Sequence, residues 1–244
     1  MTDSSYFPQI DGHRPADSRI SEFQADVARA FFGAPESTGF YIAGGAALIV
    51  NGIIDRDTDD LDAFTAHADV TKAMIALQKV AQEHGWSVEK ARVSPTFARV
   101  VVRSKDSEVV VELAQDAEPI KNLRASFLGP VLDPEDSAGQ KTLALFGRAQ
   151  PRDFADVYRL AKSFGKARLL ELAAERDTGF DPQVFAQMLG LLGNINDRQI
   201  PLPADEIPRL RRFFEQWASA LGQSVDSVRQ DILDSRDCRG RRQR

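Results

Sequence analysis

Residues 40–64 read FYIAGGAALIVNGIIDRDTDDLDAF, and this stretch decides the fold. A short apolar run comes first, and it is followed by Gly44, Gly45 and the apolar run 46–50. Two apolar runs separated by a pair of glycines predict a strand, a tight turn and a helix. The alternation of residues 60–64 at the end of the stretch predicts a second strand.

The acidic segment 55–62 contains five carboxylates in eight positions. Asp60 and Asp62 flank Leu61 at the start of the second predicted strand, so their side chains share one face of the sheet. Two neighbouring carboxylates repel each other unless a cation lies between them, and oxygen ligands suit Mg²⁺ or Mn²⁺. An EF-hand loop beginning at Asp55 is excluded, because Asp60 stands where that loop needs glycine. The alternative is a solvated acidic loop.

The glycine pair adds a candidate phosphate site upstream of the acidic segment. Glycines let backbone N–H groups approach phosphate oxygens, and a helix N-terminus favours negative charge. Gly44 and Gly45 alone are weak evidence, but they precede an Arg56-x-Thr58-x-Asp60-x-Asp62 pattern. The combination predicts a site for a metal and a phosphorylated ligand, in which Arg56 is a candidate contact of the phosphates.

A third acid is expected on a neighbouring strand. The β-branched runs 97–102 and 109–113 predict an antiparallel hairpin, and Glu112 lies inside the second run. A buried carboxylate without a partner is costly, so we assign Glu112 as a third metal ligand or as a base. The alternative is an outward-facing residue paired with Arg99 or Arg103.

The rest of the chain predicts an α+β fold, in which a small mixed sheet with helices is followed by an all-helical region. The expected domains are residues 1–120, residues 121–235 and a basic, irregular tail, 236–244. Residues 1–16 are expected to form an irregular arm. The helices expected from apolar spacing and capping signals span residues 21–32, 70–84, 134–147, 152–164, 166–175, 182–192, 204–221 and 224–234.

Composition excludes several classes of protein. The 244 residues include one cysteine and three histidines without metal-ligand spacing, which excludes a disulfide framework and a cysteine-rich zinc site. No stretch is apolar enough for a membrane helix, and the N-terminus lacks a secretion signal, so a cytoplasmic location is expected. The formal charge of −5 is unevenly distributed, because residues 236–244 contain five arginines and one aspartate.

The glycine pair and the Asp-x-Asp strand resemble those of the nucleotidyltransferase superfamily. Downstream, Lys141–Arg148 (KTLALFGR) and Pro151–Val157 (PRDFADV) resemble the lysine helix and the Arg-Asp-x-x-Asp helix of the AbiE-type toxin family, which includes AbiEii and MenT-like toxins. The resemblance spans about residues 39–165. It implies a minimal nucleotidyltransferase domain and an appended helical domain that completes the active-site cleft.

The resemblance also implies an activity. Such proteins transfer a nucleotide from an NTP to the 3′ acceptor end of tRNA, use Mg²⁺ or Mn²⁺, and are made together with a neutralising antitoxin. By position, Thr58 and Asp60 match the Ser/Thr-x-Asp catalytic motif, and Asp62 completes the metal pair. Lys141 matches the active-site lysine and Arg148 extends a basic strip, while Asp153 and Asp156 both fit the late aspartate. Without the resemblance, Lys141 would be a solvated helix residue and Asp153 a helix cap.

Two other functions share the same sequence features. The acceptor of a small-molecule nucleotidyltransferase would be a hydroxyl group of a compound such as an antibiotic, rather than RNA. A non-catalytic module would keep the fold without the activity. We disfavour the non-catalytic module because the chain keeps every residue of the matched motifs, namely Gly44, Gly45, Asp60, Asp62 and Lys141.

Overall fold

A computed structural model describes residues 18–240, with side chains described as far as residue 223. The arm expected for residues 1–16 and the last four residues of the expected tail lie outside the described residues. The chain divides into two compact units, Met1–Ala138 and Gly139–Arg244. Residues 124–131 contain two strands that join the N-terminal sheet and lie in the first unit, and the expected domain boundary at 120/121 stays a prediction.

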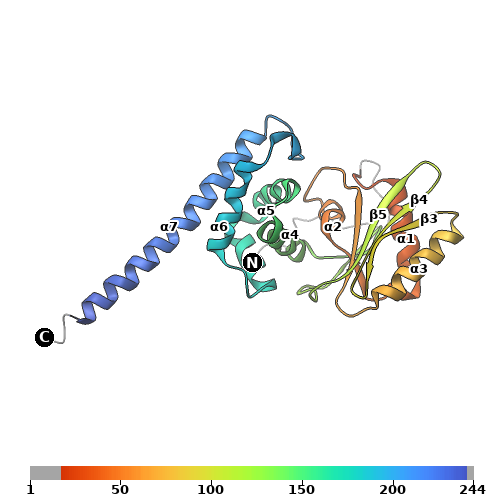
Figure 1. The fold of residues 1–244 in the computed structure, drawn as a ribbon, viewed down its shortest axis with the longest axis horizontal. Helices are drawn as coiled ribbons and strands as arrows, with labels where there is room; N and C mark the ends of the chain where they lie inside the picture. The colour runs from red at the N-terminus through yellow and green to blue at the C-terminus, as the bar shows by residue number, and fades with distance from the viewer. Residues whose placement is uncertain (1–17, 241–244) are drawn as a thin grey trace. The chain divides into compact units, whose positions relative to one another are not determined.

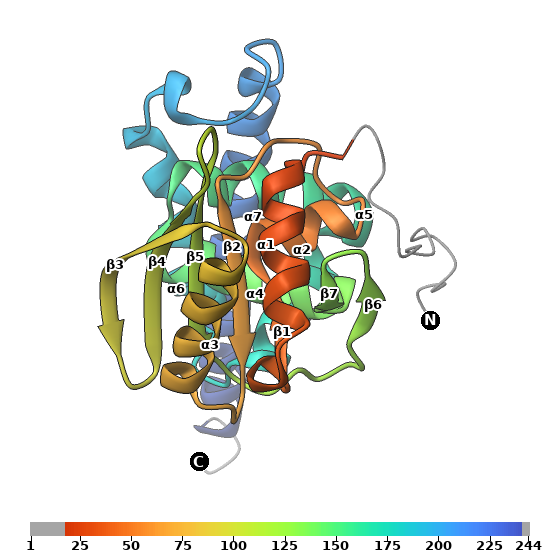
Figure 2. The same cartoon turned by 90° about the vertical axis from the view of Figure 1, so that its right-hand side faces the viewer.

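The N-terminal unit is built on a seven-stranded mixed sheet with the strand order β3-β4-β5-β2-β1-β7-β6 (Figures 1 and 2). β1 pairs with β7 and β2 with β5 in parallel, and the other neighbours are antiparallel. The strands are β1 (Phe40–Ile42), β2 (Asp60–Thr65), β3 (Ser87–Ser94), β4 (Phe97–Arg103), β5 (Glu108–Gln115), β6 (Arg124–Ser126) and β7 (Gly129–Val131). Its helices are α1 (Glu22–Phe32), α2 (Gly44–Val50) and α3 (Val70–Glu83), with the 3-10 turn η2 (Pro35–Ser37).

The two faces of the sheet differ in chemistry. Helices α1 and α3 lie side by side against one face, as Figure 2 shows. The side chains that point to these helices are apolar and fully buried, among them Leu61, Ala63, Val111 and Leu113. Because strand residues alternate between faces, Asp60 and Asp62 of β2 and Glu112 of β5 belong to the opposite face. Burial of the apolar face therefore fixes the direction of the acidic residues.

Local signals explain where these elements begin. Ser21 caps α1 in a capping box with Gln24, and Asp69 caps α3 by accepting a hydrogen bond from the backbone of Lys72. The expected hairpin of 97–102 and 109–113 is present as β4 and β5. The two three-residue strands β6 and β7 were not expected from the sequence.

The C-terminal unit is helical, and α4 begins just before it in the chain. Its elements are α4 (Pro134–Arg148), α5 (Pro151–Arg176), α6 (Pro182–Gly190), the 3-10 turns η3 (Leu191–Asn194) and η4 (Asp197–Gln199), and α7 (Ile207–Gly240). Aromatic rings fill its core, where Phe154 contacts Phe214 and Phe185 contacts Trp217 edge to face. All four side chains are at most 2% exposed.

The helices of this unit follow the expected pattern with one difference. Gly165, with φ 77° and ψ 158°, interrupts α5 at the expected break between 152–164 and 166–175. The two helices expected at 204–221 and 224–234 are instead one helix, α7, because no proline interrupts the chain after Pro208. This helix also includes residues 236–240 of the expected irregular tail.

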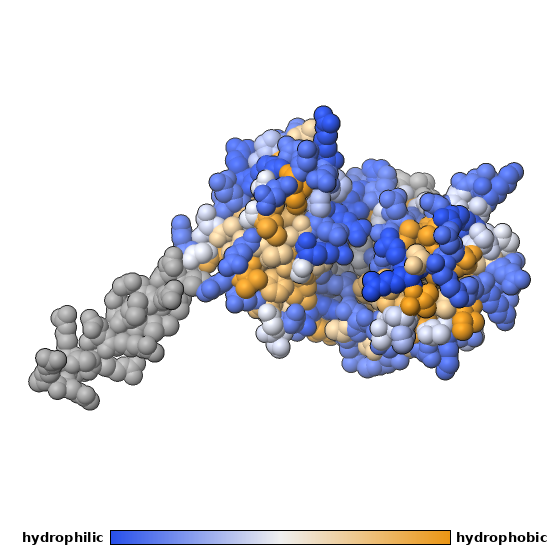
Figure 3. All heavy atoms as spheres, in the orientation of Figure 1, coloured by the Kyte–Doolittle hydropathy of each residue, from blue (hydrophilic) through white to orange (hydrophobic). Residues whose placement is uncertain are grey.

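The surface is mixed in hydropathy. Figure 3 shows polar residues over much of the visible face and apolar residues among them in both units. Ile75, Val184 and Leu191 are examples of large apolar side chains that are 40–56% exposed. Among the residues that the structure describes, no helix is long and apolar enough to cross a membrane.

Candidate active site

Gly44 begins α2 and lies against the carboxylate of Asp62. Its φ of 57° is in the left-handed region, which glycine adopts without strain. A Cβ atom at this position would overlap with Oδ2 of Asp62. The turn after β1 therefore needs glycine at position 44 for two reasons: the left-handed backbone angle and the close approach of Asp62.

Gly45 faces the other predicted residues of the acidic loop. Its Cβ position is 3.1 Å from Oγ1 of Thr58 and 3.6 Å from Nη2 of Arg56. The turn consequently brings together both glycines, Thr58, Arg56 and Asp62, which the sequence singled out as separate candidates. A cationic guanidinium, a hydroxyl and a side-chain-free backbone at one place suit the oxygens of a phosphate chain.

Glu112 lies beside Asp62 in the sheet and is paired with an arginine. Asp62 and Glu112 are direct partners on the parallel strands β2 and β5. Nη1 of Arg99 on β4 donates to Oε1 of Glu112 at 2.5 Å, and Nη2 of Arg99 is 4.0 Å from Oδ1 of Asp60. The structure thus shows the Arg99 pairing that was the alternative to metal ligation by Glu112.

The predicted metal trio of Asp60, Asp62 and Glu112 is not assembled as such. Among the side chains that the structure describes, residues 18–223, no three histidine, cysteine or acidic groups are placed so as to hold a metal ion. Asp60 and Asp62 nevertheless share one sheet face, and Asp62 adjoins the glycine turn. Mg²⁺ is usually held by one or two carboxylates together with substrate phosphates, so this donor set fits Mg²⁺ or Mn²⁺ bound with a nucleotide.

The predicted residues of the C-terminal unit form a buried ionic cluster. Nζ of Lys141 on α4 is 3.1 Å from Oδ2 of Asp156 and 3.5 Å from Oδ1 of Asp153, both on α5. Lys141 is 7% exposed, and the two aspartates are at most 1% exposed. Lys141 is therefore not a solvated helix residue, and both aspartates that the sequence left as alternatives contact it.

Arg148 completes this cluster through Asp153. Its Nε and Nη2 atoms donate to the two carboxylate oxygens at 2.9 and 3.0 Å. Burial raises the pKa of the Asp153 carboxyl, but the hydrogen bonds from Arg148 and the charge of Lys141 outweigh it, so the pKa lies below its usual value. Asp153 also accepts a hydrogen bond from the backbone N–H of Gln150 at the start of α5, so the capping role coexists with the ionic one.

Sequence reasoning missed two residues that contact the acidic loop, Gln24 and Arg19. Nε2 of Gln24 on α1 donates to the backbone oxygen of Thr58 at 2.6 Å. The sequence signal around Gln24 is the Ser21-x-x-Gln24 capping box, which predicts a helix start and nothing about a loop 34 residues away.

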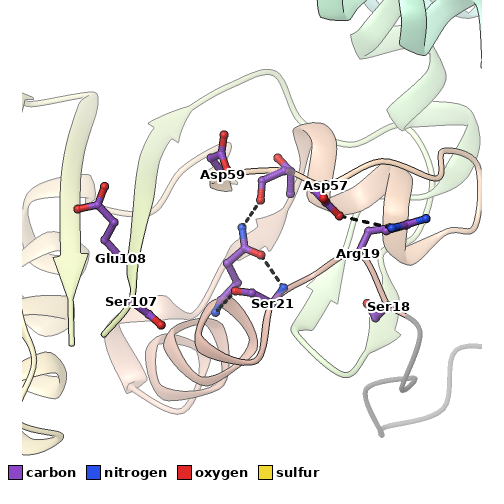
Figure 4. Close-up of a pocket in the computed structure, with 9 residues that line it drawn as sticks. Ser18, Arg19, Ser21, Asp57, Asp59, Ser107 and Glu108 are labelled. Carbon is purple, nitrogen blue, oxygen red and sulfur yellow. Dashed lines mark hydrogen bonds and ion pairs between the residues drawn. The ribbon is translucent and has the colours of Figure 1, made fainter. Parts of the chain in front are cut away.

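A polar hollow of about 380 Å³ lies beside this contact (Figure 4). Its lining comes from the start of α1, the acidic loop and the turn before β5, and consists of Ser18, Arg19, Ser21, Gln24, Asp57, Thr58, Asp59, Ser107 and Glu108. Figure 4 shows Asp57 directed at Arg19, and the two side chains approach to 3.8 Å.

The chain matches a known protein family along most of its length. The family model described as "Nucleotidyl transferase AbiEii toxin, Type IV TA system" matches residues 27–237. No protein with a curated description matches the chain.

Two solved structures share the fold at low sequence identity. A putative nucleotidyltransferase from Helicobacter pylori is 16% identical with a TM-score of 0.54, over 86% of this chain and 99% of that one. JHP933 from Helicobacter pylori is 18% identical with a TM-score of 0.52, over 86% of this chain and 98% of that one. The nucleotidyltransferase toxin MenT4 from Mycobacterium tuberculosis is 17% identical with a TM-score of 0.35, over 74% of each chain.

The family model covers most of the chain, including both glycines, the Asp-x-Asp strand and the lysine cluster. The fold of the two Helicobacter pylori structures agrees with the α+β architecture expected from the sequence. This chain belongs to the AbiEii family of nucleotidyltransferase toxins of toxin–antitoxin systems.

Proposed function

We propose that this chain transfers a nucleoside monophosphate from an NTP to the 3′-terminal hydroxyl of tRNA, and that it acts as a toxin by blocking translation. The observation that carries the proposal is the packing of Asp62 against Gly44, with Thr58 and Arg56 beside Gly45. If Asp62 were only a solvated surface acid, its carboxylate would not need to lie where a side chain of residue 44 would be.

In the proposed reaction the terminal hydroxyl oxygen of the acceptor bonds to the α-phosphorus of the NTP. The bond from that phosphorus to the bridging oxygen breaks, and pyrophosphate leaves. Phosphoryl transfer of this kind depends mainly on positioning and on stabilising charge. The backbone at Gly44 and Gly45 would bind the phosphate chain. The hydroxyl of Thr58 would donate a hydrogen bond to a phosphate oxygen, and the guanidinium of Arg56 would offset the negative charge of the phosphates.

The two aspartates of β2 have a different task. Asp60 and Asp62 would hold Mg²⁺ or Mn²⁺ together with the phosphates, and the bound ion would supply Lewis-acid stabilisation of the developing charge. Glu112 would act with them as a third ligand only on release from Arg99, and otherwise would hold Arg99 in place. The pairing with Arg99 supports the second role, because the hydrogen bond from Arg99 already engages the Glu112 carboxylate.

We infer from the resemblance of residues 141–157 to the toxin family that Lys141 is the active-site lysine, which Asp153 and Asp156 contact. Asp153 and Asp156 hold the ammonium group of Lys141 in one position, and Arg148 is held by Asp153. These contacts fix the lysine side chain, so it would lose little further freedom in the proposed role. The tRNA acceptor is proposed from the resemblance of residues 141–157 to the toxin family, and so is a neutralising antitoxin partner.

The test is transfer of label from an α-³²P-labelled NTP to total tRNA in the presence of Mg²⁺, with each of the four nucleotides in turn. Asp60→Asn and Asp62→Asn keep the size of each side chain and remove its charge. We expect transfer to fall by at least a hundredfold in each, because each removes one of two carboxylates from the proposed metal site. Asp59→Asn is the matched control, since Asp59 is an exposed acid of the same loop.

The outcomes separate the candidate functions. Label on tRNA that requires Asp60 and Asp62 supports the proposal. Label on a small hydroxyl compound with none on RNA would show a small-molecule nucleotidyltransferase instead. Absence of both transfer and NTP binding would show a non-catalytic module. Equal loss in Asp59→Asn would contradict the assignment of the pair.

A further inference from the structure

We propose that Gln24 is a positioning residue for the loop that carries Thr58 and Asp60. The inference rests on the proposed function, because the loop is the part of the chain assigned to the NTP. Gln24 lies before residue 27, outside the stretch that matches the family model. Gln24 is uncharged and is not one of the proposed substrate contacts. Its effect on them would pass through the backbone of Thr58.

Both ends of the Gln24 amide are engaged. Its Nε2 donates to the backbone oxygen of Thr58 at 2.6 Å, and its Oε1 accepts from the backbone N–H of Ser21 at 2.8 Å. The residue is 4% exposed. Because the amide is buried and each end has a partner, its orientation is fixed, and the carbonyl of Thr58 is held in turn.

The anchor of this contact is rigid. Helix α1 buries Ala25, Val27, Ala28 and Phe31 in the core, so Gln24 is fixed to the body of the N-terminal unit. The tethered segment between α2 and β2 has no regular secondary structure of its own from residue 53 to residue 59. An irregular segment depends on such side-chain contacts for its conformation.

The tether acts at the point where the loop meets the glycine turn. Thr58 places its Oγ1 3.1 Å from the Cβ position of Gly45 and 3.4 Å from the backbone oxygen of Asp60. Asp60 follows two residues later at the start of β2. A shift of the Thr58 backbone would therefore move the Thr58 hydroxyl, which is the proposed phosphate contact. It would also move Asp60, the first residue of β2.

A second contact joins the same two segments. Nε of Arg19 donates to Oδ1 of Asp55 at 2.5 Å, and Arg19 also approaches Asp57. These side chains are 47–83% exposed, so the pairs contribute little to the geometry. The buried amide of Gln24 is the stronger of the two constraints.

The alternative is that Gln24 serves only as the capping residue of α1, and one substitution separates the two roles. In Gln24→Glu, a carboxylate oxygen still accepts from Ser21 N–H, and Glu is favoured at this capping-box position. The carboxylate has no N–H for the carbonyl of Thr58 and its negative charge repels that oxygen, so the tether is lost while the cap is kept. Ser21→Ala is the matched control, because it removes the hydroxyl cap and leaves the Gln24–Thr58 hydrogen bond.

We expect Gln24→Glu to weaken NTP binding about tenfold in calorimetric titration with Mg²⁺ present, since a buried carbonyl loses its donor. The Michaelis constant for the NTP should rise more than the turnover number falls. Ser21→Ala should lower the melting temperature while NTP affinity stays within about twofold of the unsubstituted protein, because the loop is untouched. Both variants are measured well below their melting temperatures.

Unchanged NTP affinity in Gln24→Glu would overturn the inference. So would a loss of affinity in Ser21→Ala that matches that of Gln24→Glu, since the effect would then follow helix stability. Failure of the proposed function gives a different result, because the unsubstituted protein itself would neither bind NTP nor transfer label.

Discussion

Gly44 has no side chain where the Asp62 carboxylate lies, and this single contact joins the fold to the proposed chemistry. The sequence predicted both residues, because the glycine pair and the Asp-x-Asp strand each have a local pattern. It left Glu112 open between a metal ligand and an arginine partner. The register of β4 against β5, which sets Arg99 opposite Glu112, decides that pairing. The Gln24–Thr58 hydrogen bond has no local pattern, since it spans 34 positions and depends on how α1 packs.

We expect Gly44→Ala to abolish detectable NTP binding and to lower the free energy of unfolding by about 2 kcal/mol or more. The left-handed backbone alone costs an alanine about 1–2 kcal/mol, and the new Cβ would displace Asp62. Urea unfolding and calorimetric titration with NTP measure the two effects.

Gly147→Ala is the control for Gly44→Ala. Gly147 lies in α4, and a Cβ there meets no atom within 4 Å. Alanine should leave stability unchanged or raise it by about 0.5–1 kcal/mol, because glycine is a weak helix former. Wild-type NTP affinity in Gly44→Ala would show that the turn does not receive phosphates.

At the scale of secondary-structure elements, a helix or strand could be predicted from the sequence when its own residues formed a long enough pattern. The β4–β5 hairpin and the amphipathic helices contain enough alternating or periodic residues to be recognised alone. Strands β6 and β7 have three residues each, and β7 contains Pro130. They form because β7 pairs with β1, which lies more than 80 residues earlier in the chain. This pairing depends on tertiary structure, so the local sequence does not show that residues 124–131 belong to the N-terminal sheet.

Helix α5 contains the break that the sequence predicted at Gly165. Its φ of 77° with ψ of 158° belongs to a region that only glycine occupies readily. A Cβ at this position meets no atom within 4 Å, so backbone strain would be the only cost of a side chain. We expect Gly165→Ala to lower the free energy of unfolding by about 1–3 kcal/mol in urea titration.

Gly190→Ala is the matched control for Gly165→Ala. Gly190 ends α6, is not in the left-handed region, and also leaves open space around a Cβ. Its substitution should change stability by less than about 1 kcal/mol. Equal effects of the two substitutions would mean that the break in α5 is not fixed by the backbone of Gly165.

At the scale of the whole molecule, the net charge of −5 describes neither unit well. The N-terminal unit gathers its acids in the loop before β2 and on one sheet face, beside Arg56 and Arg99. The C-terminal unit pairs two cations, the buried Lys141 and the exposed Arg148, with two buried carboxylates, so its cluster is formally neutral. The chemistry of this protein therefore depends on where charges are paired, and its total charge is no guide to its substrate.

This buried pairing makes the stability of the molecule sensitive to acid. Because the pKa of Asp153 is lowered in the folded protein, the ionised carboxylate stabilises the fold fully above the usual aspartate pKa of about 3.9. That stabilisation is lost as the pH falls through the lower, folded-state pKa. Asp153→Asn should lower the free energy of unfolding by about 3 kcal/mol at pH 7, since it leaves Lys141 and Arg148 short of a partner.

Urea unfolding at a series of pH values from 7 to 3 checks this expectation. The gap between the unsubstituted protein and Asp153→Asn should narrow as the pH falls below about 4, because the asparagine variant has no proton to take up at this site. Asp197→Asn removes a surface carboxylate that is 62% exposed and paired with Arg211, and it should cost less than about 1 kcal/mol. A gap for Asp153→Asn that stays constant down to pH 3 would show that Asp153 does not govern the acid sensitivity, and the lowered pKa would then have no consequence for folding.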